Sequence, residues 1–302
     1  MKKLLALILI VCSLFALTSC GAETYELAIG VAVTAPTGDA LTVTETVAAL
    51  ILDEDGKIVA CRLDTLQAKI QPDQDGVVSD TSYKTKGELG YDYGMKDYAK
   101  TNEWFEQARA FEAYLVGKTL ADVEGIDTTK TDLVAGCTIG LGEFVPAVVA
   151  AFKDAHKVSF ESKDVPTLGV AVSNKTADKS ADDKNKVQLV ADFGAVAMVD
   201  GKVVAATLDC ADATLTYEAT EEGYTCTDFA FKGTKRAQGY GYGMKDYAQS
   251  GEWFEQAQAY ANSAVGKTAS EVASLATNGV AGCTIGAGDM QKALDKAAQN
   301  VR

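Results

Sequence analysis

An internal duplication constrains the fold of this chain more than any other feature. The stretch DLVAGCTIG at residues 132–140 returns as NGVAGCTIG at 278–286. The aromatic loop YDYGMKDY, which begins at Tyr91, returns as YGYGMKDY 149 residues further on. The segments between these landmarks also keep their order. We therefore expect two related units, at 20–160 and 161–302, which suits a chain of this length.

Each unit begins with a strand-like region, and the first unit shows a hairpin. Asp55-Gly56 is a turn-forming pair, because glycine tolerates a positive φ. Apolar residues alternate before this turn, as expected for a strand, at Val43, Val47, Ala49 and Ile51. A return strand is expected at 57–63 and a separate strand near 65–70.

Helical patterns follow the strands in both units. A helix is predicted from about 102 to 116, then a short helix capped by Thr119, then a last helix from about 142 to 155. The second unit repeats this order, with a capping box formed by Thr268 and Glu271. Hairpin strands followed by helices indicate an α+β fold. We expect two tandem repeats, each a small antiparallel sheet packed with helices.

Residues 1–19 have the pattern of a lipoprotein signal peptide. Lys2 and Lys3 precede an apolar run that is too short for a comfortable membrane span. The run ends in Leu17-Thr18-Ser19-Cys20, which resembles the bacterial lipobox. This resemblance implies that Cys20 carries a lipid and anchors the protein at the extracytoplasmic face of the cell membrane. The alternative is an ordinary secretory signal.

Charge and composition exclude several classes of function. The formal net charge is −14, and it becomes −16 when the two lysines of the signal peptide are removed. So acidic a chain is a poor partner for nucleic acid. His156 is the single histidine, which argues against histidine-based catalysis and multi-histidine metal sites.

The cysteines do not form a recognisable metal or redox motif. Five remain beyond Cys20, and none belongs to a C-x-x-C pair. Cys61 and Cys210 lie in strand-like runs, where buried thiols are expected. The sequence leaves a disulfide between Cys210 and Cys226 open.

The repeated loop is the candidate site. Gly136 and Gly282 allow the backbone to approach a ligand closely, and Thr138 and Thr284 offer hydroxyl groups. Each threonine is expected just before a helix whose first N–H groups are free, an arrangement that attracts anions. The alternative is a tight connection between a strand and a helix.

The segment from Asp132 to Thr138 resembles the signature of the FMN-binding domain family, D-x-x-S/T/A-G-A-T. The resemblance extends to the preceding hairpin and the following helix of each unit. In that family a separate flavin transferase esterifies the threonine with the phosphate of FMN. The resemblance therefore implies FMN attached at Thr138 and Thr284, on loops that also contain Gly136, Gly282, Asp132, Cys137 and Cys283.

The two copies depart from the family pattern in different degrees. Cys137 and Cys283 stand where alanine is usual, and a buried structural role is the alternative for both thiols. Asn278 replaces the acidic residue in the second copy, so Thr138 is the better candidate for attachment.

Other repeated residues allow either a functional or a purely structural interpretation. The aromatic loops could stack on a flavin ring or pack on neighbouring helices, through Tyr91, Tyr93, Tyr240 and Tyr242. Lys96 and Lys245 could reach a phosphate or remain in solvent. Trp104 and Trp253 are expected in the core, and His156 is expected to face solvent at a helix end.

We therefore expect a lipid-anchored, extracytoplasmic flavoprotein that relays electrons between redox partners, an electron carrier rather than a self-contained enzyme. The alternative is a non-redox surface lipoprotein whose paired domains bind a ligand, a cell-wall component or a protein.

Overall fold

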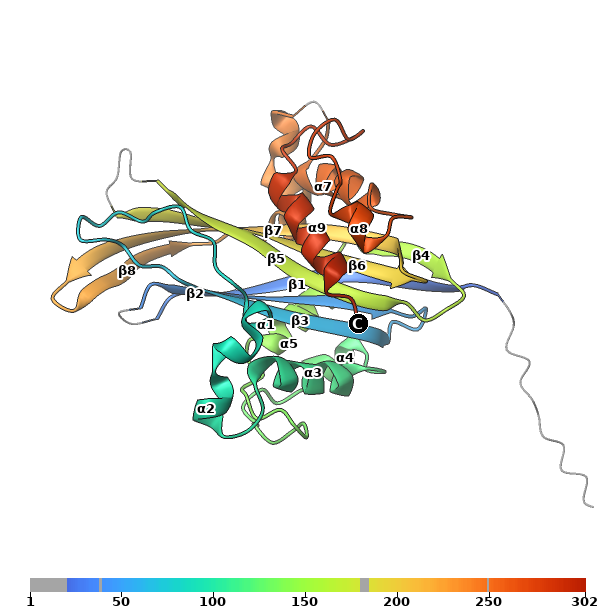
Figure 1. The fold of residues 1–302 in the computed structure, drawn as a ribbon, viewed down its shortest axis with the longest axis horizontal. Coiled ribbons are helices and arrows are strands. Elements are labelled where there is room, and N and C mark those ends of the chain that lie inside the picture. The colour runs from blue at the N-terminus through green and yellow to red at the C-terminus, as the bar shows by residue number, and fades with distance from the viewer. Residues whose placement is uncertain (1–20, 38–39, 180–184, 249) are drawn as a thin grey trace, which may run out of the picture.

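The molecule has four layers, in which two sheets lie face to face and helices cover both outer faces (Figure 1). The structure, a computed structural model, describes residues 21–37, 40–179, 185–248 and 250–302. The predicted signal peptide and Cys20 lie outside the described residues. Within the described part of the chain, no helix has both the length and the apolar character needed to cross a membrane.

The strands are β1 Glu23–Thr34, β2 Thr42–Leu52, β3 Ile58–Lys69, β4 Val158–Ser162, β5 Thr167–Asp178, β6 Lys186–Val199, β7 Lys202–Thr220 and β8 Gly223–Ala230. The helices of the first repeat are α1 Lys86–Leu89, the 3-10 helix η1 Gly90–Tyr93, α2 Met95–Ala99, α3 Trp104–Leu115, α4 Leu120–Glu124 and α5 Phe144–Phe152. Those of the second repeat are α6 Lys235–Gln238, the 3-10 helices η2 Gly239–Tyr242 and η3 Met244–Asp246, α7 Trp253–Asn262, α8 Ala269–Val272 and α9 Gly288–Gln299.

Both sheets are antiparallel, and the predicted fold class is confirmed. The first sheet has the order β3-β2-β1-β4 and the second the order β5-β6-β7-β8. Three strands of each sheet come from equivalent parts of the repeat. The fourth strands differ, because β4 pairs with β1 at one edge whereas β8 pairs with β7 at the other. β4 spans the predicted unit boundary, and the boundary itself stays a prediction.

The segments predicted as strands in the first unit are strands, but two that were predicted to be separate are continuous. The expected segments at 57–63 and 65–70 form the single strand β3. Asp64 does not interrupt this strand, because Thr85 Oγ1 donates to its carboxylate at 2.7 Å and the Gly87 amide at 3.0 Å. A buried carboxylate with such partners is compatible with a position in the middle of a strand.

The largest core cluster lies between the sheets and contains residues of both repeats. In β2, Val47, Ala49 and Ile51 belong to this cluster, whereas Ala48 and Leu50 face the helices. Both faces of the strand are therefore buried, as expected from its continuous apolar run at 47–52. Separate clusters lie between the first sheet and α3 and α5, and between the second sheet and α7 and α9.

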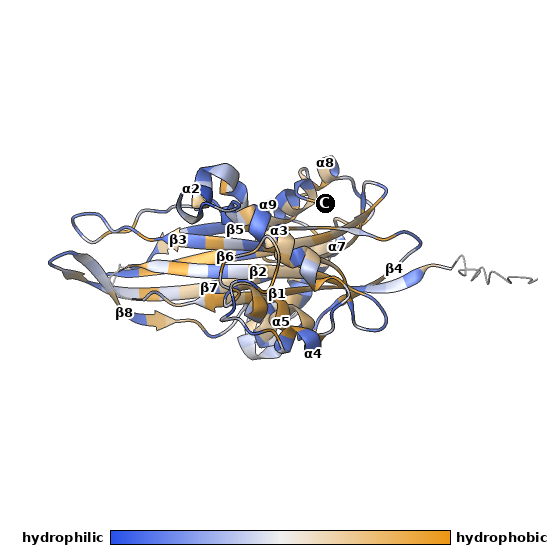
Figure 2. Cartoon of the chain, turned by 90° about the horizontal axis from the view of Figure 1, so that it is seen from below, coloured by the Kyte–Doolittle hydropathy of each residue, from blue (hydrophilic) through white to orange (hydrophobic). Residues whose placement is uncertain are grey.

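Helices α5 and α9 lie unusually close to their sheets because two glycines face them. A Cβ atom added at Gly30 would lie 2.0 Å from the Ala151 nitrogen, and one at Gly169 would lie 2.0 Å from the Ala297 oxygen. Any side chain here would displace the helix. Figure 2 shows the apolar character of α5, whose sequence FVPAVVAAF contains no charged residue.

The described cysteines are free thiols. Cys61 and Cys210 are buried, as expected. The open question of a Cys210–Cys226 disulfide is answered by the strand register, which places Cys226 opposite Tyr217.

Glu45 is an exception to the apolar pattern of the core. Strand alternation places it on the same face of β2 as Val43 and Val47, toward the other sheet. It is fully buried, and neither carboxylate oxygen has a hydrogen-bond partner among the described residues. Burial raises the pKa of Glu45 to about 8, with a smaller contribution from Asp212.

Glu45 should make the protein less stable as the pH rises. The folded-state pKa of about 8 lies above the unfolded value, so the folded protein holds an extra proton between about pH 4.5 and 8. Stability is unaffected below this window and falls through it, by on the order of 3 kcal/mol at pH 7. Denaturant unfolding of Glu45→Gln from pH 5 to 9 should show a flatter profile. The exposed Glu26→Gln is the control, and an unchanged slope in Glu45→Gln would contradict this account.

Candidate functional site

The repeated loops are tight turns of matching geometry. In the first, the Cys137 amide donates to the Val134 carbonyl at 3.0 Å, and Gly136 has a φ of +85°. In the second, the Cys283 amide donates to the Val280 carbonyl at 3.0 Å, and Gly282 has a φ of +81°. Glycine is required at the third position of such a turn, because other residues are strained at positive φ.

A buried glutamine from the preceding helix holds each loop. Gln107 of α3 is fully buried, and its Oε1 accepts from the Thr138 amide at 2.7 Å and from the Thr138 hydroxyl at 3.1 Å. Gln256 of α7 does the same for the amide and hydroxyl of Thr284, both at 2.9 Å. The threonine positions are therefore set by the helices.

The loop residues divide into an exposed face and a buried face. Thr138, Thr284, Gly136, Gly282 and Asp132 are exposed. Each threonine hydroxyl donates its proton to a glutamine, so the lone pairs of its oxygen remain available. The Cys137 and Cys283 side chains point into the two helix–sheet cores, and burial raises the pKa of both thiols.

The expectation that each threonine directly precedes a helix start was wrong. Helix α5 begins at Phe144 and α9 at Gly288, several residues beyond Thr138 and Thr284. The Thr138 amide is bound by Gln107 rather than free for an anion. An anion at these loops would therefore be held by the hydroxyl group and by side chains, not by free helix amides.

Two lysines that sequence analysis overlooked occupy equivalent positions beside the aromatic residues of their repeats. Lys86 Nζ is 5.5 Å from the ring centroid of Tyr93 and 5.8 Å from that of Trp104, and it is 3.8 Å from Glu143. Burial lowers the pKa of Lys86, with Glu143 acting in the opposite direction.

Lys235 is the equivalent residue of the second repeat. Its Nζ lies 5.5 Å from the Tyr242 ring and 5.6 Å from the Trp253 ring. It lines a cavity of about 210 Å³ with Asp192, Cys210, Ile285 and Gly286 among its walls. Burial acts to lower the pKa of Lys235, but Cys210, Tyr242 and Asp192 raise it overall. Repetition of Thr-Lys at 85–86 and 234–235 was the sequence signal for this pair.

The remaining repeated residues pack on their own repeats. Trp104 and Trp253 are buried, as expected. Tyr91 packs edge-on against Phe105, and Tyr240 packs edge-on against Phe254, while both tyrosines keep most of their surface exposed. Lys96 and Lys245 are exposed.

His156 does not face solvent as expected. It is half-buried, with its ring stacked on Phe254 at 4.0 Å between centroids. Phe254 belongs to the other repeat, which sequence periodicity could not reveal.

Comparison with known proteins gives one partial similarity. No family model matches the chain, and no solved structure matches it. The chain is similar to chlorophenol reductase of Desulfitobacterium hafniense, with 37% identity over 96 residues. This match covers 26% of the chain and 29% of chlorophenol reductase.

Replacing Gln107 should release the first loop alone. Gln107→Leu removes the acceptor of the Thr138 and Ile139 amides, so these amides should exchange hydrogen faster. The expected loss of stability is about 1–3 kcal/mol. Gln256→Leu is the matched control and should act on Thr284 but not on Thr138. Hydrogen exchange measured by mass spectrometry separates the two loops, and unchanged exchange in both variants would contradict the glutamine's role.

Proposed function

We propose that this protein is a lipid-anchored, extracytoplasmic flavoprotein that carries FMN on its repeated loops and relays electrons. The observation that supports this most is the presentation of Thr138 and Thr284. Each is an exposed hydroxyl on a tight glycine turn, held by a buried glutamine from the same helix position of its repeat. A threonine needed only for packing would not require an exposed position.

The residues at the loops fit a phosphoester. Thr138 is exposed, the lone pairs of its oxygen are not used as acceptors in the bond to Gln107, and the exposed neighbours Ala135 and Gly136 are small. A transferase could therefore reach this oxygen. The oxygen would bond to the FMN phosphorus of a flavin dinucleotide, the P–O–P bond of the dinucleotide would break with departure of the nucleoside monophosphate, and the threonine proton would pass to a base of the transferase. Flavin bound there would supply the electron-accepting and electron-donating chemistry.

A lysine beside the second loop supplies favourable electrostatics. The ammonium group of Lys235 lines a cavity with Ile285 and Gly286, which directly follow Thr284, in a protein that is otherwise strongly acidic. A positive charge in a partly buried position favours a nearby anion more than one in bulk water does. Such a charge would favour the phosphate group or a reduced, anionic flavin.

The first loop is the better attachment point. Asp132 completes the FMN-binding pattern there, whereas Asn278 stands at the equivalent position of the second loop. The similarity to chlorophenol reductase concerns 29% of that protein, so its activity does not support this proposal.

Covalent flavin should be detectable on the denatured protein. The chain is produced together with a flavin transferase, denatured, separated on a gel and viewed under ultraviolet light. Thr138→Ala should remove most of the fluorescence, and Thr284→Ala should remove the remainder. Thr129→Ala, which changes an exposed threonine outside both loops, is the control and should keep full fluorescence. An unlabelled wild-type band would exclude covalent attachment, and a native protein that stays colourless during FMN titration would exclude flavin binding.

The second candidate function is a non-redox surface lipoprotein that binds a ligand, a cell-wall component or a protein. The cavity beside Lys235 is the observation that favours it, because polar and apolar groups converge there without any need for flavin. The same FMN titration distinguishes the two candidates.

The lipid anchor is common to both candidates and can be tested separately. Cys20→Ser should prevent acylation, so the protein should move from the membrane fraction to the soluble fraction. Retention of Cys20→Ser in the membrane fraction would contradict the anchor. Cys12→Ser, which changes the other cysteine of the signal region, should leave the wild-type distribution unchanged.

A further inference from the structure

The arginines of this protein are concentrated where the two repeats meet. The chain has four arginines, at Arg62, Arg109, Arg236 and Arg302. Arg302 Nη2 lies 3.1 Å from the Glu112 carboxylate, and Arg62 Nη1 lies 3.4 Å from it. Arg62 also donates to the Arg302 carbonyl. Segments from the end of the second repeat and from β3 and α3 of the first repeat thus share one buried carboxylate.

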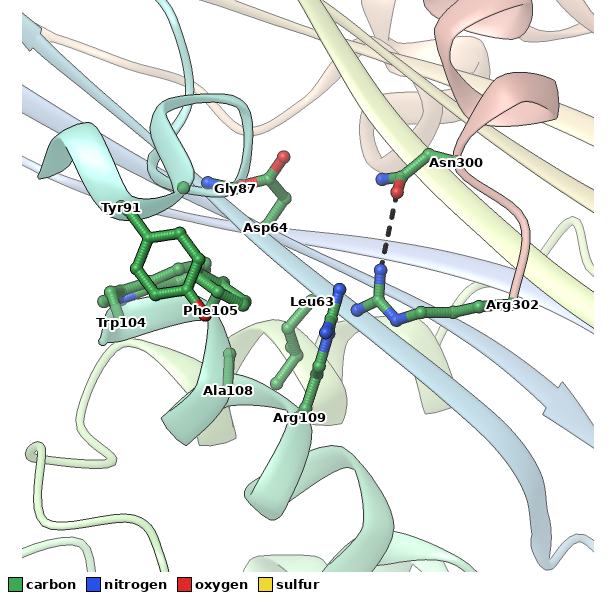
Figure 3. Close-up of a pocket in the computed structure, with 11 residues that line it drawn as sticks. Leu63, Asp64, Gly87, Tyr91, Trp104, Phe105, Ala108, Arg109, Asn300 and Arg302 are labelled. Atoms are coloured by element: carbon green, nitrogen blue, oxygen red, sulfur yellow. Dashed lines mark hydrogen bonds between the residues drawn. The ribbon is translucent and has the colours of Figure 1, made fainter. Parts of the chain in front are cut away.

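A cavity of about 240 Å³ opens beside this cluster (Figure 3). One side is aromatic, formed by Tyr91, Trp104 and Phe105. The other side carries Arg109 and Arg302, with Asn300 within 3.4 Å of the Arg302 guanidinium. Figure 3 shows the aromatic side chains on one side of Arg109 and the Arg302 guanidinium on the other.

The cavity has an excess of positive charge. Glu112 is bound by Arg302 and Arg62, but no ion pair joins Arg109 to a carboxylate among the described residues. Its guanidinium instead lies 5.0 Å from the Phe105 ring centroid. Asp64 also lines the cavity, but three groups donate to its carboxylate, and burial raises its pKa to about 6. Among the residues that line the cavity, two guanidinium groups, those of Arg109 and Arg302, thus accompany one carboxylate, that of Asp64, in a protein whose net charge is −14.

The equivalent position in the second repeat is filled by protein side chains. Arg236 stands where the first repeat has Gly87, and its Nε lies 3.1 Å from both Asp154 oxygens. Its Nη1 lies 3.4 Å from Gln258, the counterpart of Arg109. His156, the counterpart of Arg302, stacks on Phe254. In this repeat the chain itself therefore supplies a carboxylate that pairs with the guanidinium and a planar ring that stacks on the phenylalanine.

Gly87 keeps the first position open. A Cβ atom added there would lie 2.8 Å from Asp64 Oδ1, so a side chain would have to displace that carboxylate or project over the cavity. The duplication thus produced one junction in which an arginine–aspartate pair and a stacked imidazole occupy the position equivalent to this cavity, and one that lacks both. A different cavity, of about 290 Å³, lies beside Asp154 and Arg236.

We propose that the open junction binds a small aromatic acid, whose carboxylate pairs with Arg109 and Arg302 and whose ring packs against Tyr91, Trp104 and Phe105. The ligand has a single ring, because the cavity is smaller than typical sites for drug-sized molecules. Arginine suits a carboxylate because its planar fork can donate two parallel hydrogen bonds. This site is separate from the threonine loops and does not depend on flavin.

Isothermal titration of the purified protein with benzoate tests the proposal. Benzoate should bind, while acetate and benzyl alcohol should each bind at least tenfold more weakly, because each lacks one half of the ligand. Arg109→Gln introduces the residue that the second repeat has at this position, so the fold should tolerate it. It should weaken benzoate binding at least tenfold. Lys118→Gln removes an equal charge elsewhere on the surface and should leave binding unchanged.

Three outcomes would overturn the proposal. They are absence of benzoate binding at 10 mM, equal affinity for acetate, and unchanged affinity in Arg109→Gln. Tyr91→Ala provides a second variant, since Tyr91 is 67% exposed and its removal should not unfold the protein. It should weaken benzoate binding several-fold and leave the thermal unfolding midpoint near that of the wild type.

Discussion

The burial of both faces of both sheets is the constraint on which the rest of this structure depends. Each sheet covers one face with its own helices and the other face with the sheet of the other repeat. The inter-sheet cluster is continuous across the repeats, so neither sheet can lose its partner without exposing a broad apolar face to water. The unpartnered carboxyl of Glu45 lies inside this layer and is tolerated because burial favours its neutral form.

The two junctions between the repeats show how a duplicated chain can diverge. At one, the end of the first repeat supplies Asp154 and His156 to Arg236 and Phe254 of the second. At the other, the end of the second repeat supplies Arg302 to Glu112 of the first. The Asp154–Arg236 pair is almost wholly buried, so removing one partner would leave an uncompensated charge. At the second junction, the guanidinium groups of Arg109 and Arg302 line an open cavity instead.

Part of the candidate site could be predicted from the sequence. The local turn could be predicted, but the side chains that support it from a neighbouring helix could not. The glycine turn at Gly136 and the exposure of Thr138 follow from a local pattern, and the structure contains both. The supporting glutamine was not predicted, because Gln107 and Gln256 are repeated polar residues on helices that otherwise resemble amphipathic surface helices. Only their burial distinguishes them from solvent-facing residues. Helix α5 begins at Phe144, close to the predicted start near 142, but a turn at 141–143 separates its first amides from Thr138.

The sequence by itself determined the duplication, the α+β class, the hairpins and the glycine turns, because these depend on residue order and on local backbone preferences. The tertiary structure decided how the repeats face each other, since an apolar strand face does not specify which apolar surface will cover it. It also decided the interaction partners of Arg236, His156 and Arg302, because each partner is distant from its residue in the sequence. Contacts of that kind depend on the packing of two sheets, and no local pattern of residues encodes them.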